Sequence, residues 1–218
     1  MSEMRTEEEQ VEALKNWWNE NGKSLVVAIA IALSAVFGWK AWQQKQANDA
    51  EAASIAYQNL VDAVSESIGG SPDQFATSQH LASGLKQDHA GTEYARFAAL
   101  LMARLLVDQE KYDQAILELD WVLASEPTQE MASIAMMRKA RVLYAMNEHA
   151  KGIELLKGIN EAEFSAGLFE LQGDLLLASG KNDEARVSYQ KALDASKNGS
   201  ANPLLQIKFE DLVTAEEG

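Results

Sequence analysis

Hydrophobic residues run without interruption over one stretch near the start of the chain, and elsewhere they recur at helical spacing. From Leu25 to Trp39 the sequence reads LVVAIAIALSAVFGW, which holds no charged residue. At 1.5 Å per residue, a helix from Leu25 to Trp42 is roughly 27 Å long, close to the thickness of a bilayer's hydrocarbon core. The run therefore predicts one membrane-spanning helix, which we place at residues 23–43.

The residues that flank this run are typical of a membrane–water interface. Lys23 and Lys40 can bury their aliphatic stems while their ammonium groups reach the lipid headgroups. Trp39 and Trp42 stand where an aromatic belt is expected. We therefore assign Lys23, Trp39, Lys40 and Trp42 to the membrane interface, with lipid as their partner.

A buried core helix and a cleaved signal peptide are the two other interpretations of the run. A core helix seldom has lysines and tryptophans at both edges. A signal peptide has a short basic leader and a cleavage site of small residues. Here a leader of 24 residues carries six glutamates, and the run ends in bulky residues. The pattern favours a retained anchor.

The leader has a helical pattern of its own over residues 1–22. Its apolar residues lie at helical spacing, opposite glutamates and a lysine. They are Val11, Leu14, Trp17 and Trp18. This predicts an amphipathic segment on the membrane surface, with a turn into the bilayer at Asn21-Gly22. A loosely ordered leader is the alternative.

Helical periodicity continues after the span. Residues 44–91 are expected to form a stalk, which extends the membrane helix to Ser67, and a degenerate helix pair. The Gly69-Gly70-Ser71 stretch breaks the stalk, and Pro72–Asp88 forms the next helix. Three repeats are expected at 92–199, and a capping helix that starts at Asn202-Pro203 lies in the last segment, 200–218.

The three repeats are found by comparing the chain with itself. Small residues at 115, 152 and 185 are 37 and 33 residues apart. Twelve residues before each stands another small residue, namely Ala103, Ala140 and Gly173. Four residues after each stands a large one, namely Leu119, Leu156 and Tyr189. Small residues let two helices approach closely, and large ones fill the space between helix pairs.

This pattern resembles the tetratricopeptide repeat, an antiparallel helix pair of about 34 residues. Stacked pairs form a curved solenoid because one pair cannot bury its own apolar face. The sequence therefore predicts an all-α protein, a single transmembrane helix followed by a tetratricopeptide-like α-solenoid. Four residues depart from the motif: Lys139, His149, Gln172 and Asn182. Independent helix pairs without a superhelix are the alternative.

Charge bears on both partners and orientation. The chain has a net charge of −14, and from Gln46 onward it has 27 acidic and 14 basic residues. Such a domain is repelled by nucleic-acid phosphates and by anionic lipid headgroups, so no nucleic-acid partner is expected. Three basic residues precede the span closely and two follow it, so charge alone leaves the orientation open.

Few residues suggest catalysis. The chain has no cysteine and three histidines, and it has no HExxH, GxSxG or glycine-rich phosphate motif. We therefore expect no enzyme activity, no catalytic residue, no metal site and no cofactor. His149 falls at the turn of a repeat, where packing explains it.

A binding surface is expected on the first helices of the repeats, which line the concave face of tetratricopeptide arrays. Its predicted partner-binding residues are Phe97, Leu100, Arg104, Ile134, Met137, Arg141 and Tyr144, with Glu170 and Asp174 in the third unit. Arg104 and Arg141 stand one repeat apart and could hold a partner's carboxylates. The alternative is that both pair with nearby acids such as Asp108.

Several short segments, most of them in the first 66 residues, resemble one known family. They read QVEALK at 10–15, ENGK at 20–23, GWKAW at 38–42, AYQN at 56–59 and AVSE at 63–66, with QIK at 206–208. On these segments, and over nearly its full length, the chain resembles the YfgM family, the ancillary subunit of the bacterial SecYEG translocon.

The resemblance implies a single-pass protein of the bacterial inner membrane with a cytoplasmic N-terminus and a periplasmic repeat domain. It implies association with the SecYEG translocon and with PpiD, a membrane-anchored periplasmic chaperone. The implied role is an adaptor that helps to hand over newly translocated proteins. Two alternatives stay open: a holdase that binds unfolded secreted proteins directly, and a membrane tether for a cytoplasmic stress-response regulator.

Overall fold

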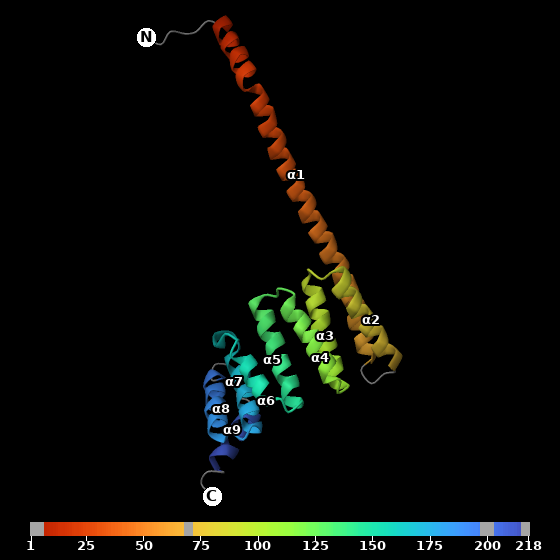
Figure 1. Ribbon diagram of the computed structural model, residues 1–218, viewed down its shortest axis with the longest axis vertical. Helices are drawn as coiled ribbons and strands as arrows, with labels where there is room; N and C mark the ends of the chain where they lie inside the picture. The colour runs from red at the N-terminus through yellow and green to blue at the C-terminus, as the bar shows by residue number, and fades with distance from the viewer. Residues whose placement is uncertain (1–6, 68–71, 197–202, 215–218) are drawn as a thin grey trace, which may run out of the picture. The chain divides into compact units, whose positions relative to one another are not determined.

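The computed structural model describes residues 7–67, 72–196 and 203–214, where all regular structure is α-helical (Figure 1). The chain divides into two compact units, the anchor unit at residues 1–51 and the repeat unit at 52–218. Helix α1, Glu7–Ser67, supplies the described part of the anchor unit and the first helix of the repeat unit. Helix α1 thus continues without a break from the apolar run to Ser67.

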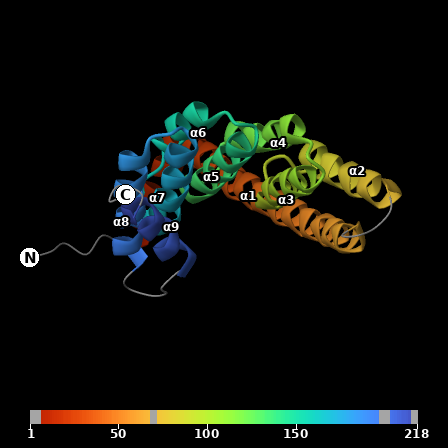
Figure 2. The ribbon, with the colours of Figure 1, turned by 90° about the horizontal axis from the view of Figure 1, so that it is seen from below.

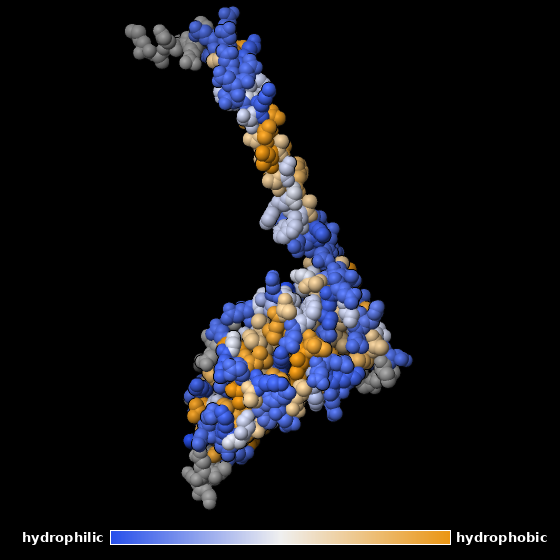
Figure 3. Space-filling view, viewed as in Figure 1, coloured by the Kyte–Doolittle hydropathy of each residue, from blue (hydrophilic) through white to orange (hydrophobic). Residues whose placement is uncertain are grey.

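The apolar run lies in α1 with all its side chains exposed. Every residue from 25 to 42 is exposed, and by length and composition α1 is able to cross a membrane. Figure 3 shows hydrophobic side chains on the visible face of the helix in this stretch. The rings of Trp39 and Trp42 contact each other at 5.0 Å between centroids. A helix this apolar and this exposed fits a lipid environment.

The predicted turn at Asn21-Gly22 is wrong, because α1 continues through both residues. The Asn21 side-chain amide donates to the Trp17 carbonyl at 3.2 Å, and the Trp18 ring lies 3.1 Å from where a Cβ on Gly22 would stand. One glycine inside a helix costs about 1 kcal/mol relative to alanine, which is too little to end it here. Residues 1–6 of the leader lie outside the described residues.

The repeat unit consists, in its described residues, of the end of α1 and the helices α2–α9. Their bounds are α2 Pro72–Asp88, α3 Glu93–Asp108, α4 Tyr112–Ala124, α5 Gln129–Ala145, α6 His149–Leu156, α7 Glu161–Ala178, α8 Asn182–Ser196 and α9 Pro203–Thr214. Figure 2 shows the three predicted pairs, α3/α4, α5/α6 and α7/α8, following one another. The predicted break at 69–71 lies outside the described residues.

The same turn ends the first helix of each pair. One residue adopts a left-handed conformation, with φ of 58°, 59° and 76° at Glu110, Asn147 and Gly180. The next N–H then bonds the carbonyl five residues back, in the pairs Lys111–Leu106, Glu148–Leu143 and Lys181–Leu176. This is the hydrogen bond of a Schellman stop. Since only the third turn uses glycine, glycine spacing alone does not reveal the repeat.

The small and large residues that define the repeats pack between the helices of the repeats. The small residues Ala103, Ala140, Ala115 and Ala185 and the large residues Leu119, Leu156 and Tyr189 are all buried. A Cβ on Gly173 would lie 2.4 Å from the Tyr189 ring, and one on Gly152 would lie 2.8 Å from Leu175. Both glycines therefore stand where another helix comes too close for a side chain.

Helix α9 covers the apolar end of the third pair. Leu205 and Leu212 are buried against Phe169, Leu176 and Tyr189. Without α9 these side chains would face water, because no further repeat follows in the described residues. A terminal helix that covers the apolar end of the last pair is what a solenoid of this kind requires.

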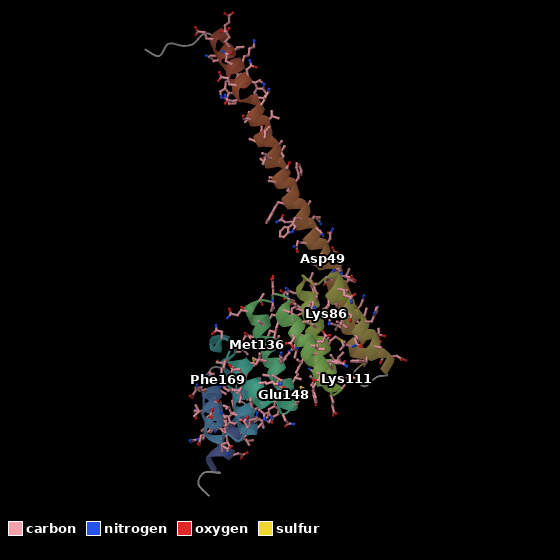
Figure 4. All side chains as sticks on the ribbon, in the orientation of Figure 1. Asp49, Lys86, Lys111, Met136, Glu148 and Phe169 are labelled. Atoms are coloured by element: carbon pink, nitrogen blue, oxygen red, sulfur yellow. The ribbon has the colours of Figure 1, made fainter. Side chains whose placement is uncertain are left out.

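Ionic contacts join neighbouring helices. Lys86 of α2 bonds Glu118 of α4 at 2.6 Å, and Lys111 lies over the Phe75 ring (Figure 4). Lys139, which departs from the repeat motif, pairs with Asp120 on the preceding helix. This departure is therefore a bridge between α4 and α5.

Candidate binding surface

The structure divides the predicted surface residues into two groups. Phe97, Arg104, Arg141 and Tyr144 are exposed, and Ile134 is half-buried. Leu100 and Met137 are only 6% and 7% exposed and belong to the hydrophobic core, so their assignment to the surface is wrong. Each lies three residues before a small interhelix residue and therefore shares its inward-facing side of the helix.

Arg104 and Arg141 line a single cavity of about 340 Å³ together with Arg138. Its other lining residues are Ala103, Val107, Asp108, Leu119 and Val142. We call this cavity the arginine pocket. Arg138 was not among the predicted residues, although it stands only three residues before Arg141 and so on the same side of α5.

The three guanidiniums have little anionic compensation. Arg138 donates to the Leu100 carbonyl at 3.2 Å. Although solvent reaches the residue, packing around the guanidinium lowers the pKa of Arg138, and the charges of Arg141 and Arg104 lower it further. Among the described residues, the one ion pair of these arginines joins Arg104 to Asp108 at 3.8 Å, with both side chains exposed. Such a surface pair contributes at most about 1 kcal/mol.

An aromatic cluster of Tyr57, Tyr94 and Phe97 lies near the arginine pocket. Its ring centroids are 5.9, 6.0 and 6.4 Å apart, and Phe97 is 39% exposed. Burial raises the pKa of Tyr57, and the charge of Arg138 lowers it in part, which places the cluster within electrostatic reach of the pocket. Of these three residues only Phe97 was predicted from the sequence. Tyr57 lies on α1, outside the predicted repeats, and Tyr94 lies in the first turn of α3.

Glu170 and Asp174, the acids predicted for the third unit, form ion pairs within the repeat unit. Lys208 of α9 bonds Glu170 at 3.0 Å and Asp174 at 2.7 Å. The Tyr189 hydroxyl also donates to Asp174 at 2.8 Å. We call these four residues the cap site. Since α9 satisfies both carboxylates, the prediction that they form an open binding surface is wrong.

The cap site is expected to weaken at alkaline pH. Burial alone lowers the pKa of Lys208, but its hydrogen bonds with Asp174 and Glu170 raise it above the ordinary 10.5. Burial and the bond to Asp174 raise the pKa of Tyr189 above 10.0. Both raised values give stabilisation that is complete below the unfolded pKa and is lost as the pH rises through the folded one.

A titration followed by tyrosinate absorbance checks this expectation. The full chain should contain a tyrosine component that ionises well above pH 10, and Tyr189→Phe should remove that component. If Tyr189→Phe instead removes a component with an ordinary pKa, the hydrogen bond to Asp174 does not hold the hydroxyl proton.

No metal-binding group was found among the described residues. His149 packs against the Tyr144 ring at 5.5 Å between centroids, in agreement with a packing role. The surface itself offers guanidinium groups and aromatic rings for recognition.

Comparison with known proteins matches this architecture. A family model described as a tetratricopeptide repeat-like domain matches residues 15–214. The "Ancillary SecYEG translocon subunit" of Escherichia coli K12 is 30% identical, over 94% of this chain and 96% of the relative. Proteins of that name from Haemophilus influenzae and Neisseria gonorrhoeae are 28% and 26% identical, over 85% and 94% of this chain and 88% and 97% of theirs.

Solved structures agree on the fold. "MamA 41-end from Desulfovibrio magneticus RS-1" superposes with a TM-score of 0.55 at 16% identity, over 76% of this chain and 89% of that one. The "MamA RS-1 ArsTM double mutant" gives a TM-score of 0.52 at 14% identity, over 77% of this chain and 96% of that one. At these identities the likeness concerns the fold alone.

Proposed function

This chain belongs to the family of ancillary SecYEG translocon subunits with a tetratricopeptide repeat-like domain, and we propose that it is a membrane-anchored, non-catalytic adaptor at the Sec translocon. One observation carries the proposal: the exposed apolar run of α1 belongs to the same helix that begins the repeat unit. The chain therefore combines a membrane anchor with a scaffold of helix pairs.

We propose that residues 1–22 are cytoplasmic and that the repeat unit lies in the periplasm. There it binds a chaperone partner, which the family resemblance indicates to be PpiD, and helps to hand over newly translocated proteins. The arginine pocket and the aromatic cluster support this role, because they offer charge and apolar contact area together on helices α1, α3 and α5.

A direct holdase activity is the second candidate, since Phe97 and Tyr144 are 39% and 43% exposed and could contact unfolded segments. The full chain in lipid nanodiscs would then suppress the aggregation of a denatured protein at near-equimolar amounts. An adaptor without holdase activity gives no such protection.

The adaptor proposal is tested by photocrosslinking in intact membranes. A crosslinking residue at position 39 should capture a translocon subunit, and one at position 97 or 104 should capture a periplasmic protein. Crosslinks from positions 97 and 104 to cytoplasmic proteins would reverse the proposed orientation. The absence of translocon subunits from every crosslinked product would contradict the adaptor role.

Trp39 and Trp42 are expected to contact the translocon as well as lipid. Replacing both with leucine keeps the run apolar, so insertion should persist, while co-purification with SecYEG should fall several-fold. The matched control replaces Trp17 and Trp18 with leucine, the same chemical change on the other side of the span. If co-purification with SecYEG is unaltered, the two tryptophans act only as a lipid anchor.

A further inference from the structure

The arginine pocket departs from the charge balance of the rest of the chain. The protein has 33 acidic and 19 basic residues, yet the pocket holds three arginines and one aspartate. Two other cations that join helices in the described repeat unit meet carboxylates: Lys86 meets Glu118, and Lys139 meets Asp120. The arginine pocket thus contains more guanidinium groups than carboxylates.

Equivalent positions in the three helix pairs carry different charges. Two positions recur in the first helix of each pair, three residues before the small interhelix residue and one residue after it. The earlier position holds Leu100, Met137 and Glu170 in the three pairs. The later position holds Arg104, Arg141 and Asp174. The third pair therefore carries acids where the first carries an apolar residue and an arginine.

In the first and third pairs, a cation from a helix later in the chain reaches one or both of these positions. In the third pair, Lys208 of α9 bonds both carboxylates, at 3.0 and 2.7 Å. In the first pair, Arg138 of α5 bonds the Leu100 carbonyl at 3.2 Å and lies in the same cavity as Arg104. Arg138 thus reaches the first pair as Lys208 reaches the third, but it shares a cavity with Arg104 instead of bonding two acids.

The walls of the pocket would strengthen a bond to an incoming carboxylate. Ala103, Val107, Leu119 and Val142 contribute apolar surface, and hydrogen bonds between charged groups gain strength as water is excluded. A second cavity, of about 470 Å³, contains Lys139 and Lys151. These lysines already pair with Asp120 and Glu148, so this cavity has no comparable unmatched charge.

The aromatic cluster adds a second contact at a defined distance. Phe97 and Arg104 are seven residues apart on α3, which is about 10 Å along the helix axis. About three residues of extended chain cover the same distance. An extended peptide that runs parallel to the α3 axis could place an apolar side chain on the aromatic cluster and a carboxylate in the arginine pocket.

We propose that the arginine pocket and the aromatic cluster together bind an extended segment of a partner polypeptide, which carries an acidic side chain about three residues from a large apolar one. The inference rests on the proposed adaptor function and specifies its ligand. A peptide fits better than nucleic acid or an anionic bilayer, because the strongly acidic chain repels extended arrays of phosphate while three local guanidiniums attract one or two carboxylates.

Fluorescence anisotropy with the full chain in phosphatidylcholine nanodiscs tests the proposal. The probe is a labelled peptide of about twelve residues, with one Phe and an Asp three residues later in a Gly/Ser background. Two counterparts replace the Asp with Asn or the Phe with Ser. We expect the probe to bind about tenfold more tightly than either counterpart, and its binding to weaken between about 50 and 300 mM salt.

Substitutions in the chain assign the binding to the pocket. Arg138→Gln and Arg141→Gln should each weaken the probe about tenfold, whereas neither should change binding of the Asn peptide. The matched control is Lys181→Gln, which removes one positive charge from an exposed residue between α7 and α8. It should leave binding unchanged. Circular dichroism shows whether each variant is folded.

Three results would overturn the proposal. One is equal affinity for the Asp and Asn peptides, and another is probe binding that both arginine variants leave unchanged. The third is self-association in the analytical ultracentrifuge that Arg138→Gln abolishes, since the occupant would then be an acidic segment of a second copy. Co-purification with SecYEG separates the two claims: a wild-type chain that binds the probe but not SecYEG keeps the pocket and loses the adaptor role.

Discussion

Replacing Gly173 with alanine is expected to destabilise the repeat unit by about 2–3 kcal/mol. The new Cβ would lie 2.4 and 2.5 Å from two carbon atoms of the Tyr189 ring. That ring is fully buried, and its hydroxyl is held by Asp174 at 2.8 Å, so it has little freedom to move away. Alanine is the better helix former by about 1 kcal/mol, which makes a net loss of stability diagnostic of the clash.

A second substitution should partly restore stability. The first two pairs combine Ala103 with Leu119 and Ala140 with Leu156, so Gly173→Ala with Tyr189→Leu gives the third pair the same combination. Tyr189→Leu alone leaves a cavity beside Gly173. Chemical denaturation of the two single variants and the double variant, followed by circular dichroism, should give a coupling free energy of about 1 kcal/mol or more.

An additive double variant would mean that the helices separate locally and that the two positions do not share one space. A Gly173→Ala variant as stable as the wild type would show directly that α7 and α8 can move apart at this point.

Replacing Leu205 with alanine should cost about 2–4 kcal/mol, because this residue of α9 is 1% exposed and packs into the apolar end of the third pair. In a solenoid each pair contacts only its neighbours, so the loss should stay local. Amide hydrogen exchange should accelerate in α7–α9 and remain unchanged in α3 and α4.

Leu204→Ala is the matched control, since the neighbouring leucine is 57% exposed. It should change stability by less than about 0.5 kcal/mol. Equal acceleration of exchange from α3 to α9 in Leu205→Ala would show that the repeat unit unfolds as one cooperative body, against the expectation for stacked repeats.

The helix pairs could be predicted from the sequence because side-chain size records how closely two helices approach. Ala103, Ala140 and Gly173 are small because another helix approaches closely at each of them. They occupy equivalent positions in the three repeats. The last helix was predicted on other grounds, namely a start at Asn202-Pro203 followed by apolar residues. Of these residues, Leu205 and Leu212 are buried.

The binding surface could be predicted only in part. A motif position indicates which side of a helix a residue is on. Leu100 and Met137 show that it does not indicate how deeply the side chain is buried, which depends on the neighbouring helix. The contacts of Glu170 and Asp174 with Lys208 join segments more than thirty residues apart, and a local pattern does not record them. The turn predicted at Asn21-Gly22 failed because one glycine is too weak a signal to end a helix.

The shared use of α1 has a consequence for the biogenesis of the protein. Ala53, Leu60 and Val64 of α1 belong to the core of the repeat unit, where they pack against residues of α2 and α3 such as Leu85 and Met102. Synthesis begins at the N-terminus, so the ribosome makes this part of the core directly after the apolar run and before its packing partners. Membrane insertion and folding are therefore consecutive steps along one helix, and a fragment designed to begin after Val64 would lack part of its own interior.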